Sequence, residues 1–357
     1  MFGLRTPGRY SPTAEEKEWI LSCASNTAEY LNGPQWQRFL EAADSRNDDQ
    51  RSPEDYLALA LDAKSEKSYE VSLGFVFAGL RLSVNDRKLQ AALYMQLGYL
   101  FKNLGVLELA IQDLDKAISL DPGNASIYNL ISVVYLEQIR YSEAEAKSKE
   151  AVKLAPNNSY YLENLGKVYY QWGRFDRAEV KFLEAIQIEP NCPEFYVSLA
   201  KVFLIKKDYA KASKNFQKSL ELKEDLSFAL KSLAEIYINI NLFFEAENFA
   251  KQALVLEPDN DQIVNIIGDI YFEQKLFSKA EIEYKKALKI NPNNAKAHKN
   301  LGHVYLELEK FSEAEFQFKE ALKLDPKSAI PLIKFKIIPQ VFENDKRSPK
   351  EIEQAGA

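Results

Sequence analysis

The side chains best suited to chemistry in this sequence are its only two histidines, His298 and His303. A helix that binds a metal ion commonly carries two histidines four residues apart, on one face. These two are five residues apart and therefore lie on different faces of a helix. We expect no metal site here. His298 is expected to pack in the interior, and His303 to contact a bound partner.

Ser198 and Lys201 form an S-x-x-K pattern, which marks a serine nucleophile in some acyl-transfer enzymes. So short a pattern arises easily by chance on a helix, and no convincing base or phosphate-binding loop accompanies it. Cys23 and Cys192 have neither metal-ligand nor redox spacing. We therefore predict that the protein is not an enzyme and has no catalytic residue, metal or cofactor. The few cysteines also predict a reducing, cytoplasmic compartment.

Composition excludes several other classes of protein. The 357 residues are 46% hydrophobic, which is enough for an extended buried core. The 52 acidic and 46 basic residues are interspersed and leave a net charge of −6, which argues against nucleic acid as a partner. No apolar run reaches the ~18 residues of a membrane span, and charges interrupt the N-terminal region, so we expect neither membrane insertion nor a signal peptide.

The elements that position these residues follow from a repeat of 34 residues. Prolines mark one position of the repeat: Pro122, Pro156, Pro190, Pro258, Pro292 and Pro326. The one missing proline is replaced by Glu224. Alanines mark another position without a gap: Ala110, Ala144, Ala178, Ala212, Ala246, Ala280 and Ala314. A period of this length indicates stacked supersecondary units.

Small and bulky residues alternate within every unit. Small side chains recur at Gly98, Ser132, Gly166, Ala200, Ala234, Gly268 and Gly302, and bulky ones at Phe101, Tyr135, Tyr169, Phe203, Tyr237, Tyr271 and Tyr305. Apolar residues follow helical spacing in two blocks separated by a short turn, such as Gly173 and Arg174. Each unit is therefore predicted to be a helical hairpin, and seven such units cover 91–328.

With these positions the sequence resembles the tetratricopeptide repeat family, and the stretch from Leu162 to Pro190 is typical of it. The resemblance covers about two-thirds of the chain. It implies an all-α fold, a right-handed superhelical solenoid of antiparallel helical hairpins. Such a fold says little by itself about function, because one fold serves many functions.

The flanking segments are expected to cap the solenoid. Residues 53–90 are predicted to be a degenerate repeat, with Ser52 capping a helix that begins at Pro53. Residues 1–52 are predicted to be a helical N-terminal cap, and 329–357 a partial C-terminal cap followed by a disordered tail. The fourth unit lacks its proline at Glu224, so the junction between units four and five is expected to be the softest.

The family resemblance also implies a concave groove, lined by the first helix of every unit, as the surface that holds a partner. In this family, the second, fifth, ninth, twelfth and thirteenth positions of the first helix usually contact the ligand. Carried across residue by residue, they predict the groove residues Met95, Tyr99, Lys102, Asn129, Tyr160, Glu163, Lys167, Tyr170, Lys201, Phe228, Lys231, Asn265, Asp269, Phe272, Lys296, Lys299 and His303, with Glu137, Glu194, Leu204 and Glu235 also at such positions. Exposed aromatic side chains supply affinity and scattered charges fix the register of a bound peptide.

Two known binding modes of the family fit poorly. The lysine and asparagine residues that clamp a chaperone carboxylate are replaced here by residues such as Met95, Tyr99 and Leu130, so a chaperone clamp is disfavoured. Asparagines at the sixth position, which hold a peptide backbone in some long members, occur only at Asn164 and Asn300.

The sequence thus predicts a non-catalytic adaptor or scaffold that binds a partner protein or peptide in the concave groove. An alternative stays open, in which the chain is an assembly factor or regulatory subunit that docks through its terminal regions. The sequence leaves open the partner, the pathway, the oligomeric state and whether the convex face binds instead.

Overall fold

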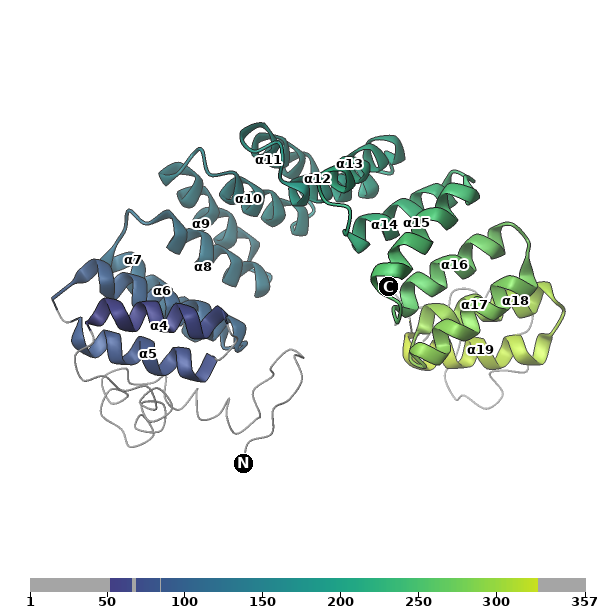
Figure 1. Cartoon of the computed structure of the whole chain (residues 1–357), viewed down its shortest axis with the longest axis horizontal. Helices are drawn as coiled ribbons and strands as arrows, with labels where there is room; N and C mark the ends of the chain where they lie inside the picture. The colour runs from purple at the N-terminus through teal and green to yellow at the C-terminus, as the bar shows by residue number, and fades with distance from the viewer. Residues whose placement is uncertain (1–51, 66–68, 84, 327–357) are drawn as a thin grey trace, which may run out of the picture. The chain divides into compact units, whose positions relative to one another are not determined.

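The computed structural model describes residues 52–65, 69–83 and 85–326, and every regular element in these ranges is an α-helix (Figure 1). The helices are α4 (Pro53–Ser65), α5 (Tyr69–Leu82), α6 (Arg87–Asn103), α7 (Leu107–Leu120), α8 (Ala125–Glu137), α9 (Tyr141–Leu154), α10 (Ser159–Gln171), α11 (Phe175–Ile188), α12 (Pro193–Ile205), α13 (Tyr209–Leu222), α14 (Ser227–Asn239), α15 (Phe243–Leu256), α16 (Asp261–Glu273), α17 (Phe277–Ile290), α18 (Ala295–Glu307) and α19 (Phe311–Leu324). The predicted N-terminal cap before Ser52 and the predicted cap and tail at 329–357 lie outside the described residues.

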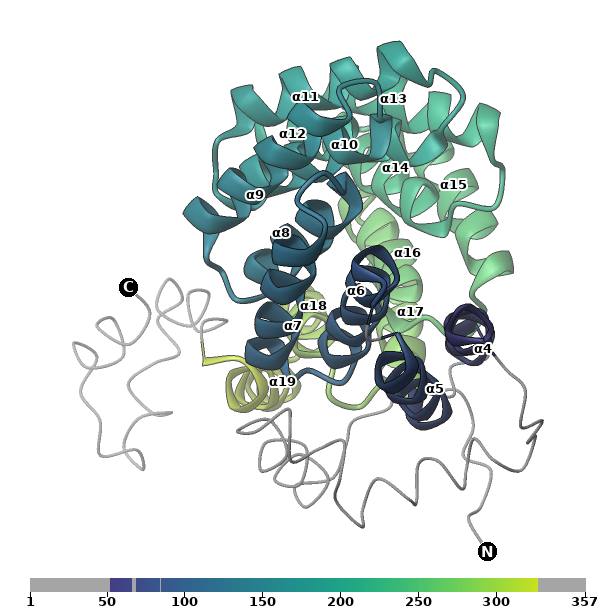
Figure 2. The same cartoon turned by 90° about the vertical axis from the view of Figure 1, so that its left-hand side faces the viewer.

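Consecutive helices pair into hairpins, from α4 with α5 to α18 with α19. From α4 to α11, and again from α12 to α19, neighbouring hairpins stack, because the second helix of one contacts the first helix of the next, as α7 contacts α8 and α15 contacts α16 (Figure 2). At the start of α4 the Ser52 hydroxyl accepts a hydrogen bond from the Asp55 backbone N–H at 3.3 Å. The predicted all-α solenoid of helical hairpins is confirmed.

Two compact units divide the chain, residues 1–190 and residues 191–357. Among the described residues, the first unit contains α4 to α11 and the second contains α12 to α19. The boundary lies between the third and fourth full repeats. That the junction between units four and five, next to Glu224, is the softest stays a prediction.

The 34-residue register of the sequence is repeated in the helix boundaries. Taking Ala91 as position 1, each later first helix begins at position 1 and each second helix at position 17. Asparagine often precedes the first helix and caps it, as Asn124 accepts a hydrogen bond from the Ser126 N–H at 3.1 Å. This N-cap explains why asparagine stands in the turns.

The two helices of each hairpin approach most closely at positions 8 and 24. Where position 8 is glycine, position 24 is a large side chain: Gly98 faces Leu114, Gly166 faces Phe182, Gly268 faces Tyr284 and Gly302 faces Phe318. A Cβ at residue 166 would lie 2.5 Å from the Phe182 ring, so the ring occupies the space that glycine leaves.

In each of the seven full repeats, the turn inside the hairpin has one residue in the left-handed backbone region, always at position 15. These residues are Gly105, Ile139, Gly173, Lys207, Asn241, Lys275 and Glu309, with φ between 57° and 77°. Isoleucine is the least suited of them, because its β-branched side chain crowds the backbone at positive φ. Ile139 has a φ of 62° and is 68% exposed, so little packing compensates for the strain.

Replacing Ile139 with glycine is therefore expected to stabilise the chain by ~1 kcal/mol, because glycine adopts this backbone conformation freely. Chemical denaturation of the wild type and of Ile139→Gly measures the difference. Ile139→Ala is the control, since alanine removes the side chain and keeps most of the strain. If the two variants unfold with equal free energies, backbone strain at residue 139 is excluded as the cause.

A buried carboxylate in the first unit makes its stability depend on pH. Asp113 on α7 is 9% exposed, and burial raises its pKa from 3.8 to about 7 against a weaker lowering effect of Lys116. The folded state thus binds more protons than the unfolded state between about pH 4 and pH 7, so stability falls as the pH rises through this range.

Asp113→Asn is expected to remove this pH dependence and to stabilise the chain above about pH 7 by at most ~4 kcal/mol, at about 1.4 kcal/mol per pKa unit. Free energies of unfolding at about pH 5 and pH 8 test this. Asp115→Asn, on the same helix but at an exposed position, is the control and is expected to keep the wild-type pH dependence. An unchanged pH profile in Asp113→Asn contradicts the prediction.

Candidate functional site

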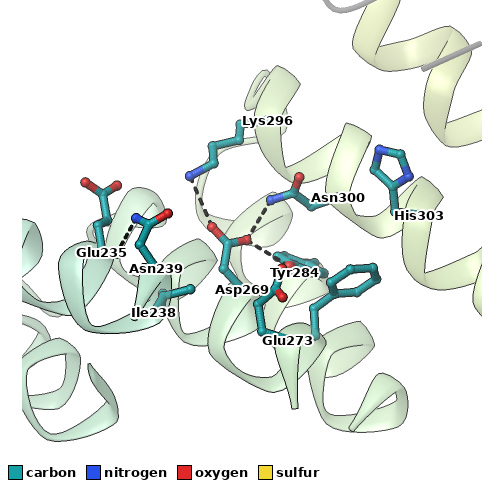
Figure 3. Close-up of a pocket in the computed structure, with 10 residues that line it drawn as sticks. Glu235, Ile238, Asn239, Asp269, Glu273, Tyr284, Lys296, Asn300 and His303 are labelled. Carbon is teal, nitrogen blue, oxygen red and sulfur yellow. Dashed lines mark hydrogen bonds and ion pairs between the residues drawn. The ribbon is translucent and has the colours of Figure 1, made fainter. Parts of the chain in front are cut away.

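A hollow of about 390 Å³ lies on the first helices of the second compact unit (Figure 3). Ten side chains from α14, α16, α17 and α18 line it: Glu235, Ile238, Asn239, Asp269, Phe272, Glu273, Tyr284, Lys296, Asn300 and His303. Four of them, Asp269, Phe272, Lys296 and His303, belong to the groove residues predicted from the sequence, and Glu235 stands at a further groove position. The structure brings these four together around one space.

Tyr284 enters this hollow from a second helix, α17, because Gly268 stands opposite it. A Cβ at residue 268 would lie 2.5 Å from the Tyr284 ring. The tyrosine is 1% exposed, and its hydroxyl donates a hydrogen bond to Asp269 Oδ1 at 2.8 Å. Burial, and next the Asp269 carboxylate, raise the pKa of Tyr284, so the phenol stays protonated and acts as a donor.

Asp269 is the centre of the hydrogen-bond network in the hollow. Besides the Tyr284 hydroxyl, Asp269 Oδ1 accepts a hydrogen bond from Asn300 Nδ2 at 2.7 Å, and Asp269 Oδ2 lies 3.1 Å from Lys296 Nζ. Asn265 Nδ2 lies 3.3 Å from both carboxylate oxygens. These contacts come from three helices, α16, α17 and α18, and they fix the position of the carboxylate (Figure 3).

The lining of the hollow carries more negative than positive charge. Glu235, Asp269 and Glu273 are carboxylates, and Lys296 is the one lysine or arginine among the ten lining residues. Burial, and next the positive charge of Lys299, lower the pKa of His303, so its imidazole is neutral at pH 7. The imidazole packs edge-on against Phe318, with 5.1 Å between the ring centroids.

The remaining predicted residues of the second unit lie on α12, α14, α16 and α18, outside the lining of the hollow. Lys201 Nζ lies 4.4 Å from the centre of the Phe228 ring, and Lys231 Nζ lies 3.0 Å from Gln262 Oε1. Phe228 is 46% exposed and therefore available to a partner.

In the first unit the predicted residues mix aromatic and charged side chains. Lys102 Nζ lies 3.3 Å from Glu137 Oε1 and 5.8 Å from the centre of the Tyr99 ring. Tyr160 is 56% exposed, whereas Tyr170 is half-buried and packs against Phe175 at 5.8 Å between ring centroids.

Two further predicted residues of this unit are partly buried. Met95 packs on the edge of the core, and Asn129 is half-buried.

Several predicted residues are already engaged within the chain. Glu163 is 6% exposed and pairs with Lys167 at 2.8 Å, and Asn265 is 1% exposed and donates to Asp269. Asn164 donates to Ser132 Oγ at 2.6 Å. Asn265 and Asn164 therefore position their neighbours and do not present an open amide to a peptide.

The other candidates for chemistry also have internal contacts. His298 Nδ1 lies 2.6 Å from Gln317 Oε1, and its Nε2 lies 3.0 Å from the Pro292 carbonyl oxygen, so the side chain bridges two elements. Ser198 is 8% exposed. Among the described residues, no group of three or more His, Cys, Asp or Glu side chains could hold a metal ion, and no helix is long and apolar enough to span a membrane.

Tyr284 is not among the groove residues predicted from the sequence, because position 24 belongs to the hairpin interior. The available signal was the hydroxyl itself, since Phe182, Phe216 and Phe318 occupy the same position in other repeats. Glu273 is not among the predicted groove residues either, although it lies at the thirteenth position of its repeat and could have been carried across like Phe272.

A second surface that the sequence analysis missed lies on α15. Phe244 and Val255, 81% and 79% exposed, are the most exposed large apolar side chains of the described residues. They are three helical turns apart and share one face. The other six repeats carry smaller or polar residues there: Glu108, Ser142, Asp176, Ala210, Ser278 and Ser312, and Ser119, Lys153, Gln187, Glu221, Lys289 and Lys323.

Comparison with known protein families gives matches along the same register. A family model described as a TPR repeat matches residues 268–309, and one described as a tetratricopeptide repeat matches 295–328. A further tetratricopeptide repeat model matches 91–124, 159–192 and 193–226. Four of these five segments span one complete 34-residue unit each.

Solved structures share the fold at low sequence identity. One comes from the functional characterization of Pseudomonas aeruginosa pilF, with 21% identity, a TM-score of 0.53, and 63% of this chain and 98% of that chain covered. A tetratricopeptide repeat protein from Parabacteroides merdae has 17% identity, a TM-score of 0.56, and coverages of 75% and 97%. The APC/C hetero-tetramer Cut9–Hcn1 has 16% identity, a TM-score of 0.54, and coverages of 83% and 60%. No curated protein matches the sequence.

The bond between Tyr284 and Asp269 predicts a specific stability effect. Tyr284→Phe is expected to cost ~2 kcal/mol, because a buried hydrogen bond to a carboxylate is lost while the ring still fills the space beside Gly268. Thermal and chemical unfolding of the full chain measure it. Tyr305→Phe is the control, since its hydroxyl lies 3.4 Å from Glu281 Oε1 and should contribute less. Equal losses in both variants would contradict a special role for Tyr284.

Proposed function

The chain belongs to the tetratricopeptide repeat family, and we propose that it is a non-catalytic interaction scaffold that holds a segment of a partner protein on its first helices. The observation that supports this most is the hollow on α14, α16 and α18. Four residues that the family resemblance predicts as ligand contacts line it, among them Asp269 and Phe272. An adaptor role follows if a second partner binds elsewhere on the chain.

The chemistry of the first-helix surface suits a peptide segment. Phe228 and Tyr160 are exposed aromatic side chains, which act as anchors in many interfaces because they bury a large area with little loss of rotamer freedom. Charged side chains lie among them and would set the register of the bound segment. The partner in this proposal is a protein or peptide and not a nucleic acid, in agreement with the net charge of −6.

A cytoplasmic setting is part of the proposal, supported by a sequence with only two cysteines, of which Cys192 is buried and unpaired. A chaperone carboxylate clamp is not, because the residues at its positions, such as Met95 and Tyr99, do not attract a carboxylate. Docking through residues 1–52, the alternative function, concerns a segment outside the described residues.

Two pairs of alanine substitutions test the proposal, one pair in each compact unit: Tyr99→Ala with Tyr170→Ala, and Phe228→Ala with Phe272→Ala. Proteins captured from a native lysate by each variant are compared with those captured by the wild type, after circular dichroism confirms that the variant is folded. We expect specific partners to be lost from at least one pair.

The matched control is Phe244→Ser with Val255→Lys, which replaces the apolar face of α15 with residues that other repeats carry there, such as Ser278 and Lys289. This variant is expected to fold and to keep the partners. If it loses them while both alanine pairs keep them, the partner binds the second helices and the proposed surface is wrong.

A further inference from the structure

The hollow between α14, α16 and α18 has two carboxylates that face solvent without a cation. Glu235 and Glu273 are exposed, on neighbouring helices that contact each other. No ion pair of either side chain occurs in the described residues. Together with Asp269, they give one small space three carboxylates against the single ammonium group of Lys296. This imbalance attracts a positive charge from outside the chain.

Asp269 is held in place by bonds that a ligand does not need to break. Tyr284 and Asn300 both donate to its Oδ1, and Tyr284 is 1% exposed. The ion pair of Lys296 with Oδ2 is of a different kind, because the lysine side chain is 53% exposed. An exposed pair contributes little to stability, so Lys296 can turn away and leave Oδ2 to another cation.

The apolar part of the lining selects the shape of that cation. Phe272 and Ile238 line the same space as the carboxylates. A lysine or arginine side chain combines an apolar stem with a charged end, and a guanidinium group also stacks on aromatic rings. A bare metal ion would use only the oxygens. His303 is neutral at pH 7 and does not repel the incoming charge.

We propose that this hollow binds a lysine or arginine side chain of the partner segment, with Glu235 and Glu273 as its counter-ions and Phe272 against its stem. The inference rests on the proposed function, because it names the chemistry of the segment that the first helices hold. It predicts that a basic residue fixes the position of the partner along the second compact unit.

A library of short random peptides, selected against the full chain, tests this without a known partner. Selected peptides are resynthesised with each arginine replaced by citrulline and each lysine by acetyl-lysine, which keep the shape and remove the charge. Binding is measured by fluorescence polarisation to the wild type, to Phe228→Ala with Phe272→Ala, to Glu235→Gln with Glu273→Gln, and to Glu245→Gln as a control. Glu245 is an exposed glutamate on α15, away from the lining of the hollow.

We expect basic residues to be enriched, and loss of one charge to weaken binding about tenfold for the wild type and for Glu245→Gln. For the variant Glu235→Gln with Glu273→Gln, the same loss of a peptide charge should weaken binding by less than about twofold, because the peptide charge has no counter-ion in this protein.

If selected peptides depend on Phe228 and Phe272 but show no basic enrichment, or lose equal affinity in all proteins, the basic-residue inference is overturned and the proposed function stands. If no selected peptide depends on those aromatic residues, the proposed function falls, and the inference with it. Self-association of the chain that the double glutamine variant abolishes would identify a second copy as the occupant and would also overturn the inference.

Discussion

The close approach of the two helices in each hairpin is the constraint on which the rest of the structure depends. The side chains at positions 8 and 24 satisfy it by their sizes. A glycine at position 8 faces a large side chain at position 24. In other repeats both side chains are small: the hydroxyl oxygens of Ser132 and Ser148 lie 2.8 Å apart, and Ala234 stands opposite Ala250. Because interiors are close-packed, a matched pair keeps the helices at a constant separation. A constant separation in turn fixes how the first helix of a hairpin lies against the second.

The sequence was sufficient to predict the fold because each packing position is sampled seven times at a period of 34 residues. Single departures such as Glu224 do not hide a pattern repeated so often. The backbone conformation of the turn at position 15 is harder to predict from residue types. Gly105, Gly173 and, more weakly, Asn241 mark the left-handed conformation by residue type. Lys207, Lys275 and Ile139 adopt it although their residue types do not favour it, because the packed helices on both sides fix the turn.

The sequence predicted where residues of the candidate site lie, but not which side chains they bond to. Repeat position placed Asp269, Phe272, Lys296 and His303 on one surface, and the structure places them around one hollow. Their bonding depends on residues about one repeat away, as Asn300 donates to Asp269 across 31 residues of sequence. A family pattern that describes one repeat at a time contains no information about such pairs. For the same reason it could not show that Asn265 is buried beneath the surface that it was expected to form.

Departures from the repeat are informative in a solenoid, because its stability adds along the stack and no single unit must be ideal. Tyr284 is such a departure in the sixth repeat, and its hydroxyl is matched by Asp269, which is matched by Asn300 from the seventh. Phe244 is another, in the fifth repeat, but it is 81% exposed and contributes nothing to the spacing of the hairpin. A departure whose polar groups are hydrogen-bonded to neighbouring repeats gives a surface of defined chemistry. An isolated exposed apolar side chain indicates only that burying it would be favourable. The proposal of a basic ligand therefore rests on the hollow on the first helices, and the apolar face of α15 supports no comparable proposal.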